Sequence, residues 1–556
     1  MCEEFIARKR ADDVSQGLCE HSKNVAEISL SLSHYPNISK LLAYLHDLGK
    51  LSTTFQNYIK NGDGERGSVV HAWQGAFLAN ELFPDDCAAA VLLKEIISFC
   101  VTAHHNHLND GIAPDGTTNY FDKFLNTADA KYSFAEIRGR LSETEKAELQ
   151  NLFEHAKPEI NDLLVKIKAV YKIKDSANFA LGLFIKYLFS CLVDADRLDA
   201  YLFDMNEKYS YQAYNWDSLI STFEKKLAQF PIRGEIDNIR KSVSDQCKAA
   251  ASRRSGIYQL SVPTGGGKTL ASFRFALHHA KKHSKRRIIY VIPYLSIIEQ
   301  TAENLNKILN LPQENDVLFE HHSNIMEPED EKAAEIRKLA ASRWDSPVIL
   351  TTMVQFLESV MSAKSGKLRK FASMADSVII FDEIQSMPTK AIHCFNEVAT
   401  FLSAILNATI ILCSATQPTL ESTQRQNLLL QEDALLIDCS REFQGIKRVT
   451  VAAEKEKDCA SAADFILEKA HENGNCLVIV NTKKSAREIY GLLKGMAAGF
   501  EILHLSTSMC PLHRAQKMND LKEYLINNKK VICVSTQLIE AGVDISFTYV
   551  VRAMTG

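Results

Sequence analysis

Apolar residues follow two different periodicities along the chain. Up to about residue 205 they recur at helical spacing, as in residues 25–32 and 161–170, and strand-like runs are few. From residue 237 onward, short β-branched runs alternate with helical stretches. That alternation is typical of doubly wound parallel sheets with helices on both faces. We therefore predict an all-α domain followed by α/β domains.

The β-branched runs form two successive sets, which predict two parallel-sheet lobes. The first set is 257–260, 287–293, 348–351, 377–381 and 409–413, and the second is 476–480, 500–505, 531–534 and 548–551. The domains we expect are a helical domain (1–205), a linker (206–236), lobe 1 (237–440) and lobe 2 (441–556). The linker aromatics between Tyr209 and Trp216 could stack on bases, but we favour packing between domains.

Composition constrains this picture only loosely. A chain of 556 residues is too long for a single core, and its net charge of −4 neither supports nor excludes nucleic-acid binding. The 13 cysteines include no C-x-x-C pair, which favours free thiols in a reducing compartment. The N-terminus is polar, and Lys186 interrupts the apolar run 180–193, so we predict no membrane-spanning stretch. We expect a cytoplasmic protein with no membrane partner.

The segment Leu260–Leu270, LSVPTGGGKTL, has the strand–loop–helix setting of a phosphate-binding loop. Glycines let backbone N–H groups approach phosphate oxygens, Lys268 supplies charge for the outer phosphates, and Thr269 supplies a hydroxyl for Mg²⁺. The residues expected to bind ATP here are Thr264, Gly265, Gly266, Gly267, Lys268 and Thr269. Val262 stands where the strict pattern has glycine. Because of this departure, the loop resembles that of superfamily 2 helicases.

An acid pair, Asp382–Glu383, follows the predicted strand 377–381. At the carboxyl end of a parallel strand it would face the phosphate loop, with Asp382 holding Mg²⁺ and Glu383 acting on the attacking water. Many relatives carry His where Gln385 stands. Whether Gln385 makes the contact that couples the acid pair to bound nucleic acid is therefore left open.

Resemblance to the same superfamily extends to the nucleic-acid contacts. The residues it implies as contacts are Gln300, Thr351, Thr352, Ser414, Thr416 and Thr536. Hydroxyl groups at strand ends suit phosphate, which carries no sequence information, although Ser414 and Thr416 could equally cap a helix. In lobe 2, Ser535–Asp544 resembles the segment STQxxExGxD, which implies that Asp544 lies on the nucleotide side.

Histidines of the helical domain gather at the ends of apolar runs. The set is His21, His46, Asp47, His71, His104, His105 and Asp196. Each histidine alone is more often a packed or solvated residue than a ligand. Together, the His–Asp and His–His doublets can bring imidazoles and carboxylates from separate helices onto one or two metal ions. A metal pair suits phosphodiester hydrolysis.

These residues resemble the HD phosphohydrolase superfamily. His21, His46, Asp47 and Asp196 match its core set, while His71, His104 and His105 match the extra ligands of two-metal members. The resemblance implies that Asp47 and Lys50 act in catalysis, with Lys50 near a substrate phosphate. It also favours Asp196 over Asp194, because 195–198 resembles the closing ADxL segment of the family.

An HD domain followed by a superfamily 2 helicase resembles the CRISPR-associated helicase–nucleases of type I systems. That resemblance implies a metal-dependent deoxyribonuclease and ATP hydrolase acting on the displaced single-stranded DNA of an R-loop, recruited by the Cascade complex. It also implies divalent transition metals in the HD site and Mg²⁺ with ATP, and we expect a monomer.

Two other functions remain open. One is an HD phosphohydrolase of nucleotides, and the other is an RNA-remodelling motor with a non-catalytic helical docking domain. The arginine-finger motif Q-x-x-G-R-x-x-R would lie shortly beyond Gly556. We therefore expect these residues alone to bind ATP and to hydrolyse it weakly or not at all.

Overall fold

A computed structural model gives the fold of two compact units. The described residues are 5–61, 69–122, 124, 132–293, 295–312, 315–322, 338–423, 425, 428–438, 449–539 and 545–554. One unit comprises Met1–Pro293 and Asn304–Phe443, and the other comprises Tyr294–Glu303 and Gln444–Gly556. The first unit contains the helical domain and lobe 1, so contacts between these parts can be described.

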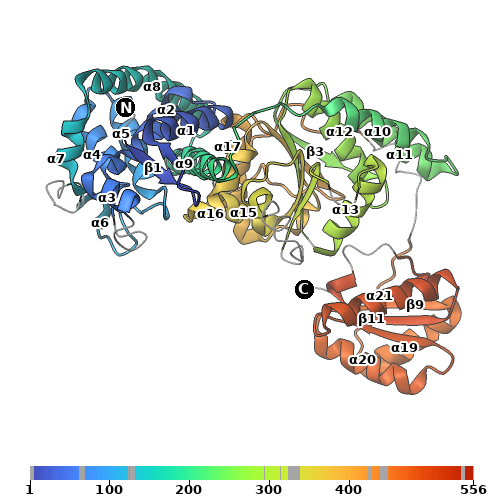
Figure 1. The fold of residues 1–556 in the computed structure, drawn as a ribbon. Helices are drawn as coiled ribbons and strands as arrows, with labels where there is room; N and C mark the ends of the chain where they lie inside the picture. The colour runs from blue at the N-terminus through green and yellow to red at the C-terminus, as the bar shows by residue number, and fades with distance from the viewer. Residues whose placement is uncertain are drawn as a thin grey trace. The chain divides into compact units, whose positions relative to one another are not determined.

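The N-terminal part is a bundle of helices around one apolar core (Figure 1). Its helices are α1 (Leu18–Leu32), α2 (Pro36–Leu45), η1 (Leu48–Leu51), α3 (Thr53–Asn61), α4 (Gln74–Leu82), α5 (Ala88–Ala103), α6 (Asn119–Asp122), α7 (Phe134–Arg140), α8 (Glu143–Val170) and α9 (Lys174–Met205). The long helix α8 begins with a capping box, in which Ser142 and Glu145 satisfy each other's backbone N–H groups.

A small antiparallel hairpin precedes these helices and departs from the predicted all-α character. Strands β1 (Ile6–Lys9) and β2 (Ser15–Gly17) pair with each other, and β1 packs against α1 and α3. The sequence did not reveal them, because runs of four and three residues are too short to show an alternating pattern.

Helix α9 lies at the centre of the first unit. It packs on α1 and α5 of the helical domain and on η4 and α17 of lobe 1. By length and composition it could cross a membrane, but 61% of its apolar window is buried inside the protein. The prediction that no stretch has this length was wrong, because Lys186 does not end the helix. The Lys186 Nζ donates to the Met361 carbonyl at 2.6 Å, so its ammonium has a polar partner although the helix around it is apolar.

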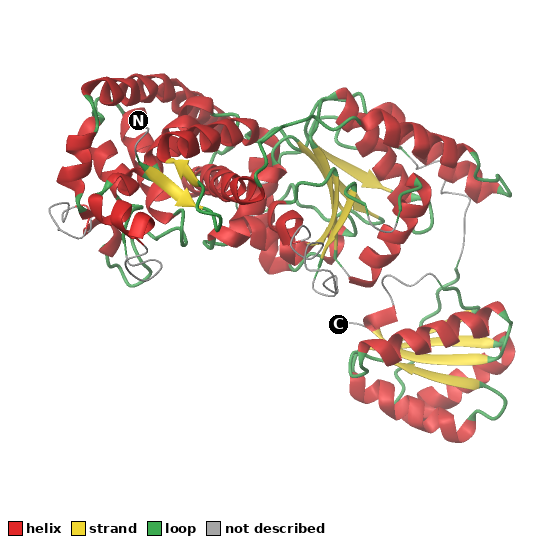
Figure 2. Ribbon diagram, in the orientation of Figure 1, coloured by secondary structure: helices red, strands yellow, loops and turns green. Residues whose placement is uncertain are grey.

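Lobe 1 is a six-stranded parallel sheet flanked by helices (Figure 2). Its strands run in the order β3-β8-β7-β4-β6-β5. They are β3 (Ile257–Ser261), β4 (Arg287–Ile292), β5 (Leu318–His321), β6 (Val348–Thr352), β7 (Ser377–Phe381) and β8 (Thr409–Ser414). Its helices are α10 (Trp216–Ala228), α11 (Glu235–Ala250), α12 (Lys268–Lys282), α13 (Leu295–Leu309), α15 (Met353–Met361), α16 (Ser365–Leu368), η4 (Arg369–Met374), η5 (Ile384–Ser386), η6 (Thr389–Ala391) and α17 (Ile392–Ala404).

The strand runs predicted for lobe 1 are confirmed to within a residue or two, and edge strand β5 was not predicted. Its four residues end in Glu320 and His321 and are only partly buried, so they lack a long apolar run. Parallel order places the carboxyl ends of β3, β7 and β8 along one edge of the sheet, where the ATP motifs begin.

The predicted linker contains a helix. Helix α10 is capped by Asn215 and packs on α12, and the Trp216 indole donates to the Lys285 carbonyl at 2.9 Å. Of the aromatic residues before it, Tyr209 packs against the core shared by the helical domain and lobe 1, as favoured, whereas Tyr211 is 51% exposed. The Tyr209 hydroxyl lies 2.5 Å from Ser31 Oγ of α1. The Arg286 guanidinium lies 5.5 Å from the centroid of the Tyr211 ring.

Lobe 2 is a smaller sheet domain with its own cores. Its four parallel strands run in the order β10-β11-β9-β12. The elements are α19 (Cys459–Asn473), β9 (Asn475–Val480), α20 (Lys483–Met496), β10 (Glu501–Leu505), α21 (Pro511–Ile526), β11 (Val531–Thr536), η7 (Gln537–Ile539) and β12 (Tyr549–Arg552). Separate apolar clusters cover the sheet, in which β9 and β11 are mostly buried, whereas β12 alternates between half-buried and exposed residues.

Candidate metal centre and ATP site

The predicted metal ligands meet at one place in the helical domain. His21 lies in α1, and His46 and Asp47 lie where α2 passes into η1. His104 ends α5, with His105 after it, and Asp196 lies in α9. The apolar faces of these helices are buried against one another, so residues at their ends and along α9 converge.

The Asp47 carboxylate stands at the centre of the ligand set. Its Oδ2 lies 3.1 Å from His21 Nε2 and 3.3 Å from His46 Nε2. Asp196 Oδ1 lies 3.5 Å from the same His21 nitrogen. These donor atoms all fall within 4.8 Å of one another, as a single metal ion requires.

The other Asp47 oxygen faces a second group of histidines. Oδ1 lies 3.4 Å from His104 Nε2 and 4.0 Å from both His71 Nε2 and His105 Nε2. The buried Asp47 Oδ1 and His104 Nε2 have no hydrogen-bond partner. Orphaned buried acceptors of this kind are costly unless a cation is bound. The residues therefore fit one or two divalent ions, because one oxygen of Asp47 faces each group of histidines.

Backbone and carboxylate acceptors orient the histidine rings. The Nδ1 atoms of His46, His71 and His104 lie 2.8, 2.9 and 2.6 Å from the carbonyls of Ala43, Val69 and Val101. Each ring thus turns its Nε2 towards Asp47, which is the usual arrangement behind metal-ligating histidines.

Charge and burial tune the protonation of the ligands. Burial alone would raise the pKa of Asp47, but Lys50 and His46 bring it well below its usual value. Burial disfavours the His46 imidazolium, yet the adjacent Asp47 carboxylate raises the pKa of His46. Burial lowers the pKa of His105 to about 2 and also lowers that of His71. Lys50 Nζ lies 2.6 Å from Asp47 Oδ2.

Two residues at this site were missed by sequence reasoning. Asp199 Oδ2 lies 2.6 Å from His21 Nδ1 and orients that ring. Arg8 of β1 reaches His21 Nδ1 at 3.1 Å and Asp196 Oδ1 at 3.4 Å through Nη2. The spacing of Asp199, one turn beyond Asp196 on the same helix face, was a usable signal. Arg8 offered none, because its strand is too short to be predicted.

Asp194 points away from the ligands. Its carboxylate is held by the Arg343 and Arg369 guanidinium groups of lobe 1, at 2.9 and 2.5 Å. The preference for Asp196 as the ligand therefore agrees with the geometry, and Asp194 belongs to the interface between the helical domain and lobe 1.

The glycine-rich loop forms the start of α12. Gly265 and Gly267 have φ of 79° and 85°, the left-handed region that glycine adopts at little cost. Gly267 is the N-cap of α12, so the loop ends where the first N–H groups of the helix could bind phosphate oxygens. Thr264 is exposed, Gly266 is buried, and Thr269 lies in the first turn of the helix.

The acid pair reaches the loop lysine. Lys268 Nζ lies 3.1 Å from Asp382 Oδ1 and forms an ion pair with Glu383. Burial disfavours the charged ammonium, but both acids outweigh it and raise the pKa of Lys268. Lysine and acids thus converge where the outer phosphates of ATP and a magnesium ion would lie.

Gln385 links this site to the strand β8. Its amide Nε2 donates to Glu383 Oε2 at 2.5 Å, and its Oε1 accepts from Ser414 Oγ at 2.6 Å. Ser414 is buried and also meets the backbone of Thr416. Glutamine thus contacts Ser414 at the position where many relatives carry His, and its part in coupling stays a prediction.

The predicted nucleic-acid contacts fall into different environments. Thr351 is fully buried and donates to the His321 carbonyl at 3.1 Å, and the Thr352 side chain caps α15. Gln300 and Thr416 are exposed, and Thr536 is half-buried. In this conformation Thr351 and Ser414 have no face available to a strand. Asp544 lies outside the described residues.

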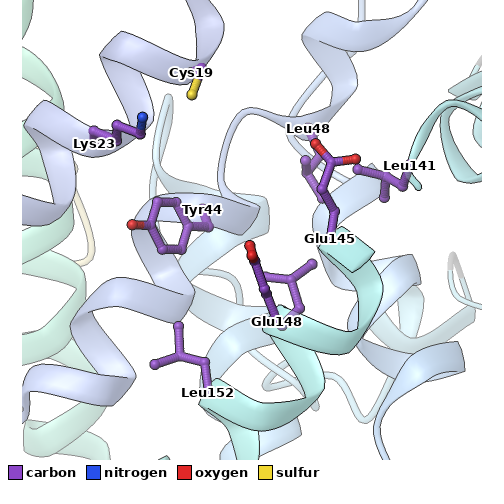
Figure 3. A pocket seen from close by; sticks show the side chains of 9 residues that line it. Cys19, Lys23, Tyr44, Leu48, Leu141, Glu145, Glu148 and Leu152 are labelled. Carbon is purple, nitrogen blue, oxygen red and sulfur yellow. The ribbon is translucent and has the colours of Figure 1, made fainter. Parts of the chain in front are cut away.

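A pocket elsewhere in the helical domain uses none of these residues. Cys19, Lys23, Tyr44, Leu48, Leu141, Glu145, Glu148, Leu149 and Leu152 line it (Figure 3). Figure 3 shows the polar groups of Lys23, Tyr44, Glu145 and Glu148 beside the leucine side chains of the wall. It holds no histidine and is separate from the ligand set.

Comparison with known proteins decides the family. The family model of DEAD/DEAH box helicases matches residues 243–423, and that of the C-terminal part of CRISPR-associated nuclease/helicase Cas3 matches residues 472–555. A CRISPR-associated nuclease/helicase Cas3 of Haloferax volcanii is 22% identical over 463 residues, which cover 74% of this chain and 49% of that protein. The chain belongs to the Cas3 family.

Other Cas3 relatives match nearly the whole chain. A putative Cas3 of Methanocaldococcus jannaschii is 23% identical over 90% of this chain and 71% of its own length. Against the Haloferax volcanii Cas3, in contrast, the chain spans about half of the relative.

Solved structures show a common fold. The crystal structure of T. fusca Cas3 with ATP superposes with a TM-score of 0.62 at 16% identity, over 98% of this chain and 70% of that one. A chain of a CRISPR RNA-guided surveillance complex, pre-nicking, has a TM-score of 0.56 at 16% identity, over 99% of this chain and 69% of its own length. A helical domain with parallel-sheet lobes is therefore a Cas3-like fold.

Proposed function

We propose that this protein is an ATP-dependent single-stranded DNA translocase joined to a metal-dependent HD nuclease, acting in CRISPR type I defence. The observation that carries the proposal is the Asp47 carboxylate, whose two oxygens face separate groups of imidazoles within one buried site. Membership of the Cas3 family supports the link to CRISPR defence and to a helicase.

In the nuclease site, the ligands would hold one or two divalent transition metal ions. Such ions supply an activated water and stabilise the leaving oxygen of a phosphodiester. His21, His46 and Asp196 would bind on one side of Asp47, with His71, His104 and His105 on the other. Lys50 would orient the scissile phosphate, and the buried histidines with low pKa values stay neutral and able to ligate.

In the ATP site, Lys268 and Thr269 would bind the phosphates with Mg²⁺, and Asp382 would bind the ion. Glu383 would orient the attacking water once ATP draws Lys268 away from it. Gln385 and Ser414 then connect that acid to the end of β8. Asp544 remains a prediction for the nucleotide side.

The partners follow from the same proposal. The substrate is single-stranded DNA, delivered as the displaced strand of an R-loop opened by the Cascade surveillance complex. The fold it shares with a chain of a surveillance complex in a pre-nicking state is consistent with that recruitment. We propose a monomer in the cytoplasm, and the cysteines that the structure describes are all free thiols, as a reducing compartment allows.

The test is cleavage of circular single-stranded DNA, which requires an internal cut. We expect degradation that depends on added divalent metal, is lost in Asp47→Ala and is retained in Lys268→Ala at short times. ATP binding should show the converse pattern. Parallel reactions with mononucleotides test the phosphohydrolase, and metal content after chelation and re-addition tests the motor with a non-catalytic helical domain. Hydrolysis of mononucleotides alone, or unchanged DNA cleavage by Asp47→Ala, would contradict the proposal.

A further inference from the structure

A short segment of lobe 1, Ser362–Arg369, touches the metal site from two directions. We call it the clasp. It follows α15 directly and comprises the loop after that helix, α16 and the first residue of η4. The clasp contributes no metal ligand. It forms hydrogen bonds with the loop that follows His105 and with helix α9, which carries Asp196.

The first direction is the loop that carries the histidine doublet. Leu108 N–H donates to the Ala363 carbonyl at 3.0 Å, and Ser365 N–H donates to the Asn106 carbonyl at 3.2 Å. His107 and Lys364 form an antiparallel bridge between these bonds. This small ladder begins directly after His105, so it fixes where the doublet lies.

The second direction is helix α9. The Arg197 guanidinium donates to Ser365 Oγ at 2.7 Å, and Arg369 Nε donates to Asp194 Oδ1 at 2.5 Å. The ligand Asp196 lies between these two anchored positions. Ser365 therefore joins both directions, because its backbone holds the histidine loop and its hydroxyl holds α9.

The charged cluster in which Arg369 of the clasp takes part is buried. Asp194, Arg343 and Arg369 are all less than 9% exposed, at 2%, 8% and 5%. A buried charge cluster costs desolvation, and apolar packing would often be at least as stable. Its directional bonds instead fix one register of α9 against lobe 1. Register matters here because a shift of α9 moves Asp196 and Asp199 together.

The other end of α15 lies at the edge of the sheet where contacts to single-stranded DNA are predicted. Thr352 caps this helix, accepting from Gln355 N–H at 3.1 Å. Nine residues of helix span about 14 Å. One rigid element thus runs from the carboxyl end of β6 to the clasp.

We propose that the clasp positions the metal ligands, with Ser365 and Arg369 as positioning residues, so that lobe 1 sets the affinity and spacing of the two metal ions. This inference rests on the proposed metal-dependent nuclease. It adds that contacts from lobe 1 hold the metal ligands of the helical domain in position.

The test uses the full chain and Mn²⁺ as the probe, measured by calorimetry and by electron paramagnetic resonance of the coupled ion pair. Ser365→Ala removes a bond to Arg197, the neighbour of the ligand Asp196, and we expect Mn²⁺ to bind about tenfold more weakly, the lower end of the range for partners that bond to a ligand directly. The signal of the coupled pair should fall at equal Mn²⁺. Arg369→Lys, which keeps the charge and loses the planar fork, should act in the same direction through α9 alone.

Matched controls lie in the same segment. Lys364→Ala removes an exposed side chain whose bridge uses only backbone atoms, and Ser365→Thr keeps the hydroxyl. Both should keep wild-type Mn²⁺ affinity. Unchanged affinity and an unchanged coupled signal in Ser365→Ala and Arg369→Lys would overturn the inference. Equal Mn²⁺ binding by wild type and Asp47→Ala would instead overturn the proposed nuclease site.

Discussion

At the scale of single residues, Arg8 is a cation that faces Asp196. Its side chain is 17% exposed, and Asp196 is 14% exposed. A divalent ion bound by Asp196 competes with this guanidinium for the same carboxylate. Arg8 should therefore weaken metal binding while it stabilises the metal-free site.

We predict that Arg8→Gln binds Mn²⁺ about fivefold more tightly, the equivalent of roughly 1 kcal/mol. The same variant should unfold at a lower temperature in the presence of a chelator. Calorimetric titration and thermal unfolding measure the two effects. Arg10→Gln is the control, because Arg10 pairs with Asp12 at the surface of the same hairpin. Weaker Mn²⁺ binding in Arg8→Gln would show that Arg8 supports the ligands instead of competing.

His46 gives the metal site a pH dependence of defined sign. Its pKa is raised by Asp47, so its proton must leave before Nε2 can bind a metal. His71 and His105 have lowered pKa values and are already neutral. Without metal, the raised pKa of His46 stabilises the fold at low pH, and that contribution is lost as pH rises through the folded value.

We therefore predict that Mn²⁺ affinity falls as pH is lowered through the pKa of His46, by about tenfold per pH unit. Binding at a pH below the pKa of His46 should release about one proton. Calorimetry in buffers of different ionisation enthalpy counts the proton directly. Affinity that is constant between about pH 6 and 8 would mean that His46 is neutral in the metal-free protein.

At the scale of structural elements, the path from Ser414 through Gln385 to Glu383 joins β8 to the short helix after β7. Gln385→Ala should leave ATP affinity within about twofold and should reduce any stimulation of ATP hydrolysis by single-stranded DNA. Ser414→Ala should do the same. If the residues act as one path, the double variant is no worse than either single variant. Additive losses would separate the two roles.

The sequence predicted elements and ligand types well, because both depend on local patterns. β-Branched runs located the strands of both lobes, and residues of the His46–Asp47 and His104–His105 doublets belong to the groups that could hold a metal ion. Contacts between distant segments could not be predicted. Arg8 reaches the site through a hairpin too short to show a period, and Ser365 reaches it from lobe 1. The burial of Thr351, too, is set by packing on β5.

At the scale of the whole molecule, the helical domain and lobe 1 share one apolar core. Residues of both, such as Phe184 and Phe395, belong to a single buried cluster, and the Tyr187 and Phe371 rings lie 6.0 Å apart across the interface. Lobe 2 has separate clusters of its own, including the fully buried Ile532. Elements that share a core unfold together, so this chain should unfold as two cooperative parts.

We predict two calorimetric transitions, of which Mn²⁺ shifts only one. At a free Mn²⁺ concentration of 100 times Kd, the ion should stabilise the first unit by about 2.7 kcal/mol. Ile532→Ala should lower the other transition alone, since loss of a buried isoleucine costs roughly 2–5 kcal/mol. Asp47→Ala should abolish the Mn²⁺ shift and leave the lobe 2 transition unchanged. Separate melting of the helical domain and lobe 1 would contradict the shared core and, with it, the register that the clasp imposes on α9.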